Sequence, residues 1–454
     1  MSERDTIVLK FGGTSVRDAD AMRRVVKITK ENGGQTPVVV TSACAGVTND
    51  LVACGNFCVE RNEAEAITII DKLTERHLGI LDDLCHDGSP HRCDRQLGLL
   101  LDELRQLVRG VMLLGETTPR AIDTILSFGE RLSSTILTTA FREAGINTGL
   151  ADSRQVISTD GTHGSALPII SAIEPKGSEV IQPLQKSHDV VIAQGFIGST
   201  LEGVTTTIGR GGSDHSAALF GVALGAKEIQ IWTDVDGVMT ADPRLVPEAK
   251  AVPEMTFTEA RELAWFGAKI IHPDTILPAL AKHIPVVIRN SHSPSAPGTR
   301  ICPDDHSLSP GFHSLTIKRD LILVEIATRN PGMEREVLDR AIGLFAHYQA
   351  PIECAVIAES RASVLVSKSV WNDRLHVRIE SICNVEIRKE MAILCLIGSG
   401  LRDTPALLSL PLTALHNIPI RLLAAGSSDH VVLLGIDEAD GDNGLQALHE
   451  ALFP

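Results

Sequence analysis

Segments with strand character alternate with segments of helical character along this chain, and this alternation most constrains its fold. Short apolar runs predict buried strands at Thr6–Phe11, Pro37–Thr41, Val190–Ala193, Glu228–Thr233 and Pro285–Arg289. Apolar residues at helical spacing lie between them, at Asp18–Lys30, through most of 47–144, and at 213–224, 256–265 and 273–282. Such alternation is typical of a largely parallel sheet covered on both faces. We therefore predict a three-layer α/β/α domain over residues 1–300.

The stretch that follows has the composition of a linker. Prolines occur among Ser, His and Asp at Pro294, Pro297, Pro303 and Pro310. We therefore place a linker at residues 301–311.

The order βαββαβ then occurs twice. The first copy comprises Leu321–Ala327, Met333–His347, Ile352–Ala358, Ala362–Ser367, Trp371–Cys383 and Val385–Lys389. The second comprises Ala392–Ile397, a helix near 404–416, Ile418–Ala424, His430–Gly435 and Asn443–Leu452. This second copy lacks its last strand, which the spare strand Phe312–Lys318 could supply. We predict two ferredoxin-like modules, the first (321–390) inserted into the second (312–320 and 391–454).

The composition excludes several classes of protein. A length of 454 residues allows two or three domains. The net charge of −15 argues against a nucleic-acid partner, which would need a basic surface. No long apolar run predicts a membrane span. Met1–Asp5 lacks a basic flank leading to an apolar segment, and the nine cysteines form no dense framework, so we expect a cytoplasmic protein with reduced thiols.

One group of cysteines and histidines has the composition of a metal site. Cys85, His86, His91 and Cys93 lie close together, but their spacing matches no common zinc site. A polar connection between two long helices is the alternative, and we favour it. We therefore predict no metal held by protein side chains.

The run Lys10-Phe11-Gly12-Gly13-Thr14-Ser15 has the features of an anion-binding turn. A strand ends at Lys10, and glycines then let the backbone approach a ligand closely. Backbone amides of the following turn would face phosphate oxygens, and Lys10 adds a positive charge. An ordinary strand–turn–helix connection is the alternative.

A second glycine cluster surrounds Arg210. It lies in Thr205-Thr206-Thr207-Ile208-Gly209-Arg210-Gly211-Gly212-Ser213-Asp214 and resembles neither a P-loop nor a dinucleotide-binding loop. An arginine in such a loop suits a carboxylate, because its guanidinium can donate two parallel hydrogen bonds. Capping of the next helix by Ser213 and Asp214 is the alternative, although it leaves the glycines unexplained.

The remaining candidate segments are weaker. Trp232–Arg244 follows a strand, at the sheet edge where ligands bind in open α/β folds. Lys269 lies in the apolar run Phe266–Pro273, which is unusual for a lysine without a partner. We expect His272 to be structural. Glu130 begins a helical stretch rich in Ser and Thr.

Together these motifs resemble those of the aspartate kinase family, within the wider amino-acid kinase (carbamate kinase-like) fold. The resemblance covers the whole chain, with the repeated modules matching the family's paired ACT regulatory domains. Thr41–Asn49 also matches that family's second glycine-containing loop.

The resemblance implies a role for each matching residue. Aspartate would be bound by Thr48, Glu130, Arg210 and Ser213. ATP would be bound by Lys10, Gly12, Gly13, Ser15, Thr233, Asp234, Met239, Arg244 and Lys269. Lys10, Asp214 and Lys269 would be catalytic, with Asp214 orienting the two lysines. Mg²⁺ would be held mainly by phosphates and water.

The resemblance also implies a reaction and its regulation. Mg-ATP would phosphorylate the side chain of L-aspartate, the first step towards lysine (by way of diaminopimelate), threonine and methionine. Lysine or threonine would be the effector, near Asn330, Gly332, Met333, Glu353, Ser427 and Ser428. Arg329 occupies a loop where relatives often carry an acid, and Glu353 could substitute for that acid. We expect a homodimer or homotetramer through the ACT domains, and no homoserine dehydrogenase domain after Pro454.

Two other functions are compatible with the same residues. The first is kinase activity on another substrate, such as glutamate, acetylglutamate or a nucleotide. The second is a non-catalytic amino-acid sensor that retains the kinase domain as a scaffold.

Overall fold

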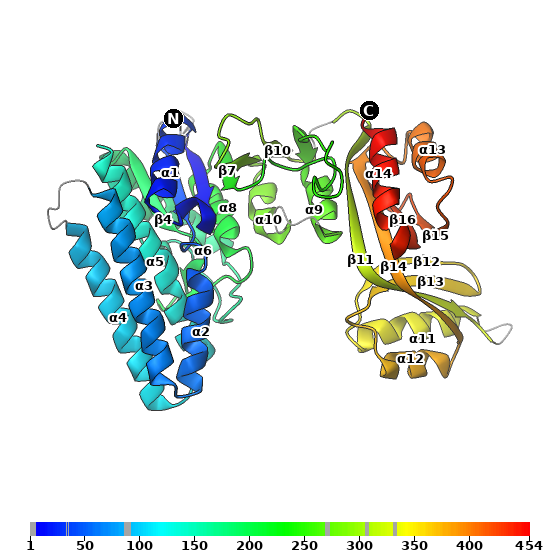
Figure 1. Ribbon diagram of the computed structural model, residues 1–454, viewed down its shortest axis with the longest axis horizontal. Helices are drawn as coiled ribbons and strands as arrows, with labels where there is room; N and C mark the ends of the chain where they lie inside the picture. Colours follow the sequence, from blue (N-terminus) through cyan, green and yellow to red (C-terminus); the bar gives the residue numbers. More distant parts are fainter. Residues whose placement is uncertain are drawn as a thin grey trace. The chain divides into compact units, whose positions relative to one another are not determined.

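The computed structural model describes residues 6–32, 34, 36–85, 92–267, 273–304, 308–329 and 334–454. The chain forms two compact units, which Figure 1 shows coloured along the sequence. The first unit comprises Met1–Gly237 and Ile270–Pro303. The second comprises Val238–Lys269 and Asp304–Pro454. Val238–Lys269 therefore packs with the C-terminal part of the chain. The domain limits expected from the sequence stay a prediction.

The sheet of the first unit is built mainly from parallel strands. Its order is β3 (Thr148–Ala151), β4 (Val190–Gln194), β2 (Val38–Thr41), β1 (Ile7–Phe11), β7 (Glu228–Thr233), β9 (Val286–Asn290) and β10 (Thr299–Cys302). Neighbouring strands in this order run parallel, except that β10 is antiparallel to β9. Lys10 lies opposite Val40 on one side and Ile231 on the other. The predicted largely parallel sheet is confirmed.

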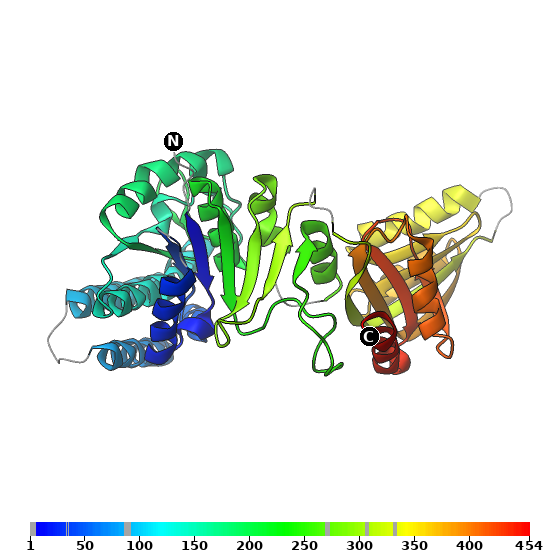
Figure 2. The same cartoon turned by 90° about the horizontal axis from the view of Figure 1, so that it is seen from above.

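Helices cover both faces of this sheet (Figure 2). Helix α5 (Pro119–Glu143) packs on β2, β3 and β4, and α8 (Gly212–Leu224) packs on β1, β2 and β7. Helices α1 (Ala19–Asn32), α2 (Val47–Val59), α3 (Glu63–Leu84) and α4 (Arg92–Leu114) extend the layer of α5. The shorter elements are η1 (Gly13–Val16), η2 (Ser153–Gln155), η3 (Gly177–Ile181), α6 (Ile170–Lys176), α7 (Gln182–Ser187), α10 (Pro273–Ala281), β5 (Ile197–Ser199) and β6 (Thr205–Thr207).

Buried apolar residues hold these layers together. Phe11 and Trp232 stack with ring centroids 6.0 Å apart, and both side chains are fully buried. The sequence at the start of helix α5 favours helix initiation. Thr118 is the N-cap residue, and its hydroxyl accepts a hydrogen bond from the Ala121 amide, while Pro119 occupies the first helical position. None of the described helices is both long enough and apolar enough to cross a membrane.

The sheet of the second unit is antiparallel and joins both predicted βαββαβ modules. Its order is β12 (Ile352–Ile357), β13 (Arg361–Ser367), β11 (Gly311–Ala327), β14 (Asn384–Ser399), β16 (Val431–Asp437) and β15 (Ile420–Ala424). The sequence predicted four separate strands where β11 and β14 now run. Asp320 and Glu390 have positive φ at the two predicted breaks (57° each). The backbone kinks there, but pairing between β11 and β14 continues on both sides of the kinks.

Each end of this sheet has its own apolar core. Helices α11 (Glu334–His347) and α12 (Asp373–Glu380) lie side by side over one core, which includes Val324, Phe345 and Leu375. Helices α13 (Pro405–Ala414) and α14 (Gly441–Leu452) lie over the other, with η4 (Glu438–Asp440) before α14. Strand β8 (Glu254–Thr256) and α9 (Phe257–Trp265) also belong to this unit.

Candidate active site

One cavity of about 390 Å³ in the first unit brings together the strongest sequence motifs. Its wall comes from the turn after β1, the loop after β2, helix α5 and the glycine loop that leads into α8. The lining residues are Lys10, Gly13, Ser42, Ala43, Cys44, Ala45, Gly46, Thr48, Asn49, Glu130, Phe196, Gly209, Gly211, Gly212, Ser213 and Asp214. These segments are far apart in the sequence and meet because parallel strands end at the same edge.

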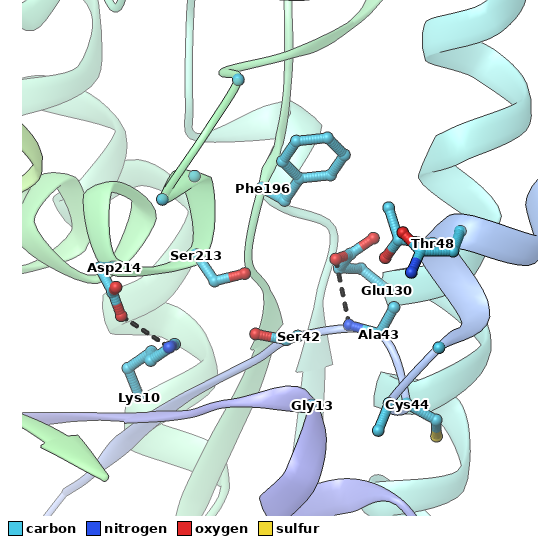
Figure 3. Close-up of a pocket in the computed structure, with 16 residues that line it drawn as sticks. Lys10, Gly13, Ser42, Ala43, Cys44, Thr48, Glu130, Phe196, Ser213 and Asp214 are labelled. Atoms are coloured by element: carbon cyan, nitrogen blue, oxygen red, sulfur yellow. Dashed lines mark hydrogen bonds and ion pairs between the residues drawn. The ribbon is translucent and has the colours of Figure 1, made fainter. Parts of the chain in front are cut away.

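Lys10 and Asp214 form an ion pair at one side of the cavity (Figure 3). The Lys10 ammonium lies 2.6 Å from the Asp214 carboxylate, and both side chains are largely buried (11% and 16% exposed). Asp214 lies in the first turn of α8, where unpaired backbone amides favour negative charge. The pair places a lysine beside a helix N-terminus, so this wall can bind an anion such as phosphate.

The turn after Lys10 approaches the loop 42–46 closely. A side chain at Gly13 would place its Cβ 2.8 Å from the Ala43 carbonyl oxygen, so only glycine fits without a backbone shift. The Ala45 amide donates to the Gly13 carbonyl (3.1 Å), which joins the two loops. Arg76 on α3 donates to the Ala45 carbonyl (2.8 Å) and supports the loop away from the cavity.

Glu130 is a buried carboxyl group with one oxygen unused. Its Oε1 accepts a hydrogen bond from the Ala43 amide (3.0 Å), while its buried Oε2 has no hydrogen-bond partner among the described residues. Burial raises the pKa of Glu130 to about 8, against the opposing effect of the Ala43 hydrogen bond. Such a group suits a ligand that brings a hydrogen-bond donor or a positive charge.

The glycine–arginine loop, which leads into α8, forms another part of the cavity wall. Gly209 and Gly211 both have positive φ (75° and 71°), a conformation that glycine adopts without a steric penalty. Arg210 between them is exposed and forms no ion pair or hydrogen bond with any other residue that the structure describes. Its own side chain does not line the cavity, although both neighbouring glycines do.

Comparisons with known proteins agree with this geometry. A sequence model of the amino acid kinase family matches residues 5–290, and an ACT domain model matches residues 394–452. The chain is 32% identical to lysine-sensitive aspartokinase 3 of Escherichia coli (strain K12), with 99% of each chain covered. This chain belongs to the aspartokinase family.

Two solved structures of E. coli aspartokinase III resemble this aspartokinase-family chain along its length. Both are 32% identical to it and cover 99% of this chain and 100% of their own. The complex with lysine and aspartate (T-state) gives a TM-score of 0.82. The complex with aspartate and ADP (R-state) gives a TM-score of 0.78. The amino-acid kinase fold with C-terminal ACT domains is thus confirmed.

Phe196 lines the cavity, although no motif in the sequence predicted it as a site residue. It has positive φ (65°), which is strained for a bulky side chain. The Ser216 hydroxyl accepts a hydrogen bond from the Phe196 amide (2.9 Å), and the Phe196 carbonyl accepts from the Ile208 amide (3.0 Å). Nothing in the local sequence except the preceding glycine signals this conformation.

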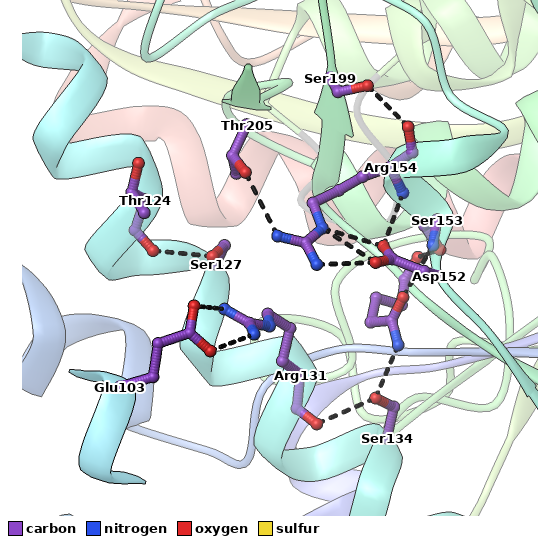
Figure 4. Close-up of polar contacts among 11 residues, drawn as sticks. Glu103, Thr124, Ser127, Arg131, Ser134, Asp152, Ser153, Arg154, Ser199 and Thr205 are labelled. Atoms are coloured by element: carbon purple, nitrogen blue, oxygen red, sulfur yellow. Dashed lines mark hydrogen bonds and ion pairs between the residues drawn. The ribbon is translucent and has the colours of Figure 1, made fainter. Parts of the chain in front are cut away.

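A polar network supports the site from behind (Figure 4). Arg131, next to Glu130, pairs with Glu103 through two hydrogen bonds (2.7 and 3.2 Å) and lies over the Phe128 ring. Arg154 pairs with Asp152 (2.7 Å). Through a longer contact of 3.4 Å, it also reaches the hydroxyl of Thr205 on β6. The first pair joins α4 to α5, and the second joins the η2 turn to β6.

Several predicted ligands of the first unit lie outside the cavity wall. Ser15 is buried, and its hydroxyl donates to Ser291 (2.9 Å), so its side chain is already used. Gly12 precedes the turn without lining the cavity. Thr233 and Asp234 lie at the end of β7, where the Thr233 hydroxyl donates to Asp234 (3.2 Å).

The other predicted ligands belong to the second unit or are not described. Met239 accepts a hydrogen bond from Ser314 at its carbonyl (2.8 Å), and Arg244 is an exposed partner of Asp242. Glu353 is largely buried and pairs with Lys318 (2.7 Å). Ser427 and Ser428 lie in the loop between β15 and β16. Asn330, Gly332, Met333, Lys269, His272, His86, His91 and the side chain of Cys93 lie outside the described residues.

Proposed function

We propose that this chain transfers the γ-phosphoryl group of Mg-ATP to the side-chain carboxylate of L-aspartate, producing 4-phospho-L-aspartate. This reaction is the first step of lysine, threonine and methionine biosynthesis. The observation that carries the proposal is one cavity that joins the Lys10–Asp214 pair to the unused oxygen of Glu130. The E. coli relative of known structure, in complex with aspartate and ADP, supports the same assignment.

Aspartate binding needs one acceptor for its ammonium and donors for its α-carboxylate. Glu130 supplies the acceptor, because its Oε2 is buried and otherwise unpaired. Arg210 supplies a guanidinium that no described residue occupies. Thr48 and Ser213 also line the cavity and would complete the substrate-binding set. The side-chain carboxylate would then point towards Lys10.

ATP binding would use the loop after β1 and the start of α8. Lys10 contributes its charge, Gly12 and Gly13 allow close approach, and Ser15 can contribute only its backbone because its side chain is buried. The remaining proposed ATP ligands are Thr233, Asp234, Met239, Arg244 and Lys269. No group of three His, Cys, Asp or Glu side chains within the described ranges could hold a metal. We assign Mg²⁺ to the phosphates and water.

The chemistry needs positioning and charge neutralisation rather than a base. The aspartate carboxylate is ionised at neutral pH and is already a nucleophile. In-line transfer requires two anions to be brought together and the charge on the moving phosphoryl group to be balanced. Lys10 and Lys269 would balance this charge, and Asp214 would orient them.

We also propose feedback regulation through the ACT modules, with lysine as the first effector to test and threonine as the second. The E. coli relative is named as lysine-sensitive. Glu353, Ser427 and Ser428 are the described candidates, together with Asn330, Gly332 and Met333. Because Lys318 already neutralises Glu353, an effector ammonium would have to displace it. The edge strands β12 and β15 are the proposed seam of a homodimer or homotetramer.

The regulatory proposal is tested by adding millimolar lysine and threonine, singly and together. A fall in activity with a rise in melting temperature supports it, because an effector that binds the folded protein must stabilise it. No change in either quantity overturns it.

The catalytic proposal is tested by incubating the protein with Mg-ATP and one acid at a time, and trapping acyl phosphate with hydroxylamine. Aspartyl hydroxamate is the expected product. Hydroxamate from glutamate but not aspartate would overturn the substrate assignment, and none from any acid would favour the sensor. Lys10→Ala should abolish turnover in a folded protein, because the transferring phosphoryl group loses its nearest cation.

A further inference from the structure

The three threonines before the glycine–arginine loop are all buried and all hydrogen-bonded. They form strand β6, and successive side chains of a strand point to opposite faces. Thr205 meets Arg154 (3.4 Å) and Thr207 donates to Asp123 (2.6 Å), while Thr206 meets Thr159 (2.7 Å) on the other face. Strand β6, which precedes Arg210 in the chain, is therefore held in place through its side chains as well as its backbone.

The shortest of these three hydrogen bonds is the one to Asp123. Asp123 has no role in the proposed reaction. Its carboxylate is completely buried near the start of α5. One oxygen accepts from the Thr207 hydroxyl, and the Nδ1 of His163 lies 2.7 Å from the other. The Gly164 amide donates to both oxygens (3.1 Å each). Four hydrogen bonds to one buried carboxylate make a rigid junction.

This junction holds the strand before the glycine–arginine loop and a second loop that packs beside it. Thr207 lies two residues before Gly209, so its hydroxyl bond fixes the point from which the loop starts. Gly164 lies in a second loop that packs against Gly209, where an added Cβ would meet the Gly164 carbonyl at 3.4 Å. The Arg210 side chain forms no hydrogen bond or ion pair with any other described residue. Its position therefore depends on the backbone that Asp123 anchors.

Helix α5 connects this anchor to Glu130. Asp123 and Glu130 are seven residues apart on that helix, so they lie on nearly the same face, separated by about 10 Å along the axis. The helix thus carries the ammonium acceptor and, through Thr207, the loop with the carboxylate donor. A rigid helix can set the spacing between the two groups that grip a small amino acid.

We propose that Asp123 is a positioning residue for aspartate binding. By holding Thr207 and Gly164, it presents Arg210 at a set spacing from Glu130. The inference rests on the proposed function, in which Glu130 and Arg210 bind the substrate.

The test is steady-state kinetics of Asp123→Asn and Thr207→Val in the full chain. Asn replaces an acceptor oxygen by a donor facing other donors, and Val removes the hydroxyl with little change of shape. Both should raise the KM for aspartate about tenfold and leave the KM for ATP and kcat within about threefold. Thr207→Ser retains the hydroxyl and should restore the wild-type KM.

Thr159→Val is the matched control, because it breaks the buried hydroxyl contact on the opposite face of β6. Its KM for aspartate should stay within about twofold of the wild type. The inference is overturned if folded Asp123→Asn and Thr207→Val keep the wild-type KM, or if Thr159→Val raises it equally. A wild-type protein that makes no aspartyl hydroxamate would instead refute the proposed function. If Asp123→Asn does not fold, Thr207→Val with its Ser rescue decides.

Discussion

Two buried glutamates, one in each unit, have opposite surroundings. Glu130 in the first unit uses one oxygen and leaves the other without a partner among the described residues. Glu259 in the second unit, at the start of α9, is fully buried with both oxygens used. Its oxygens meet His313 (2.9 Å), the Ser399 hydroxyl (2.7 Å) and the Thr256 amide (2.7 Å).

The protonation of the two carboxyls follows from these contacts. Burial raises the pKa of Glu130 to about 8 because a single amide cannot replace water around the charged form. Burial also acts to raise the pKa of Glu259, but His313, the Thr256 amide and Ser399 together lower it below its ordinary value. A satisfied buried carboxylate holds a fold together, whereas an unsatisfied one is available to a ligand.

Glu130→Gln should have the largest effect. The neutral amide cannot pair with the substrate ammonium, so kcat/KM for aspartate should fall about a thousandfold. Hydroxamate formation measures this loss. The melting temperature at pH 7 should change little, because Glu130 itself is mostly protonated there without substrate. A normal kcat/KM would remove Glu130 from the substrate site.

Glu259→Gln should act on stability instead. It leaves His313 without its anionic partner, so the second unit should lose about 3 kcal/mol of unfolding free energy. Ser399→Ala removes only one neutral donor and should cost about 1 kcal/mol. Urea titration followed by a probe in the second unit measures both. Equal stability of Glu259→Gln and wild type would contradict the distinction between the two glutamates.

Aspartate binding should release a proton from Glu130. Near pH 7 the empty site is mostly protonated, and the arriving ammonium favours the ionised carboxylate, so about one proton should leave per aspartate bound. Calorimetry in buffers of different ionisation enthalpy measures this number. It should fall towards zero above pH 9, where Glu130 is already ionised. Identical heats in every buffer at pH 7 would show that Glu130 does not change charge.

The smallest effect concerns the Glu259–His313 pair. Hydrogen bonding to Glu259 raises the pKa of His313 from 6.5, against an opposing effect of burial. The contribution of protonated His313 to stability is therefore complete below pH 6.5, and it is lost as the pH rises through the raised pKa of His313. The lowered pKa of Glu259 adds stability above pH 4.5 that is lost as the pH falls.

The pair should therefore stabilise the second unit most between pH 4.5 and 6.5. As the pH rises above 6.5, wild type should lose more unfolding free energy than His313→Gln, measured by urea unfolding at each pH. Parallel pH profiles for the two proteins would mean that the pair does not titrate in this range.

Much of the fold could be predicted from local pattern. The strands β1, β2, β4, β7 and β9 and the repeated βαββαβ order follow from apolar periodicity and turn residues. The main errors were at Asp320 and Glu390, where the sequence predicted strand ends and the structure instead has single residues with positive φ inside the longer strands β11 and β14. Strand β6 was missed because its buried threonines are polar, and β10 because it lies in a proline-rich stretch.

The sequence by itself determined which residues are candidates for the chemistry. Glycines lie close to Lys10 and on both sides of Arg210, and they can be recognised in the sequence. They occur there because a backbone that must approach an anion closely or adopt positive φ needs glycine at that position. Only the tertiary structure decided which groups surround these residues. Phe196, Asp123 and the difference between Glu130 and Glu259 depend on partners distant along the chain. Whether a buried charge is satisfied depends on all the groups around it in space, which no local pattern contains.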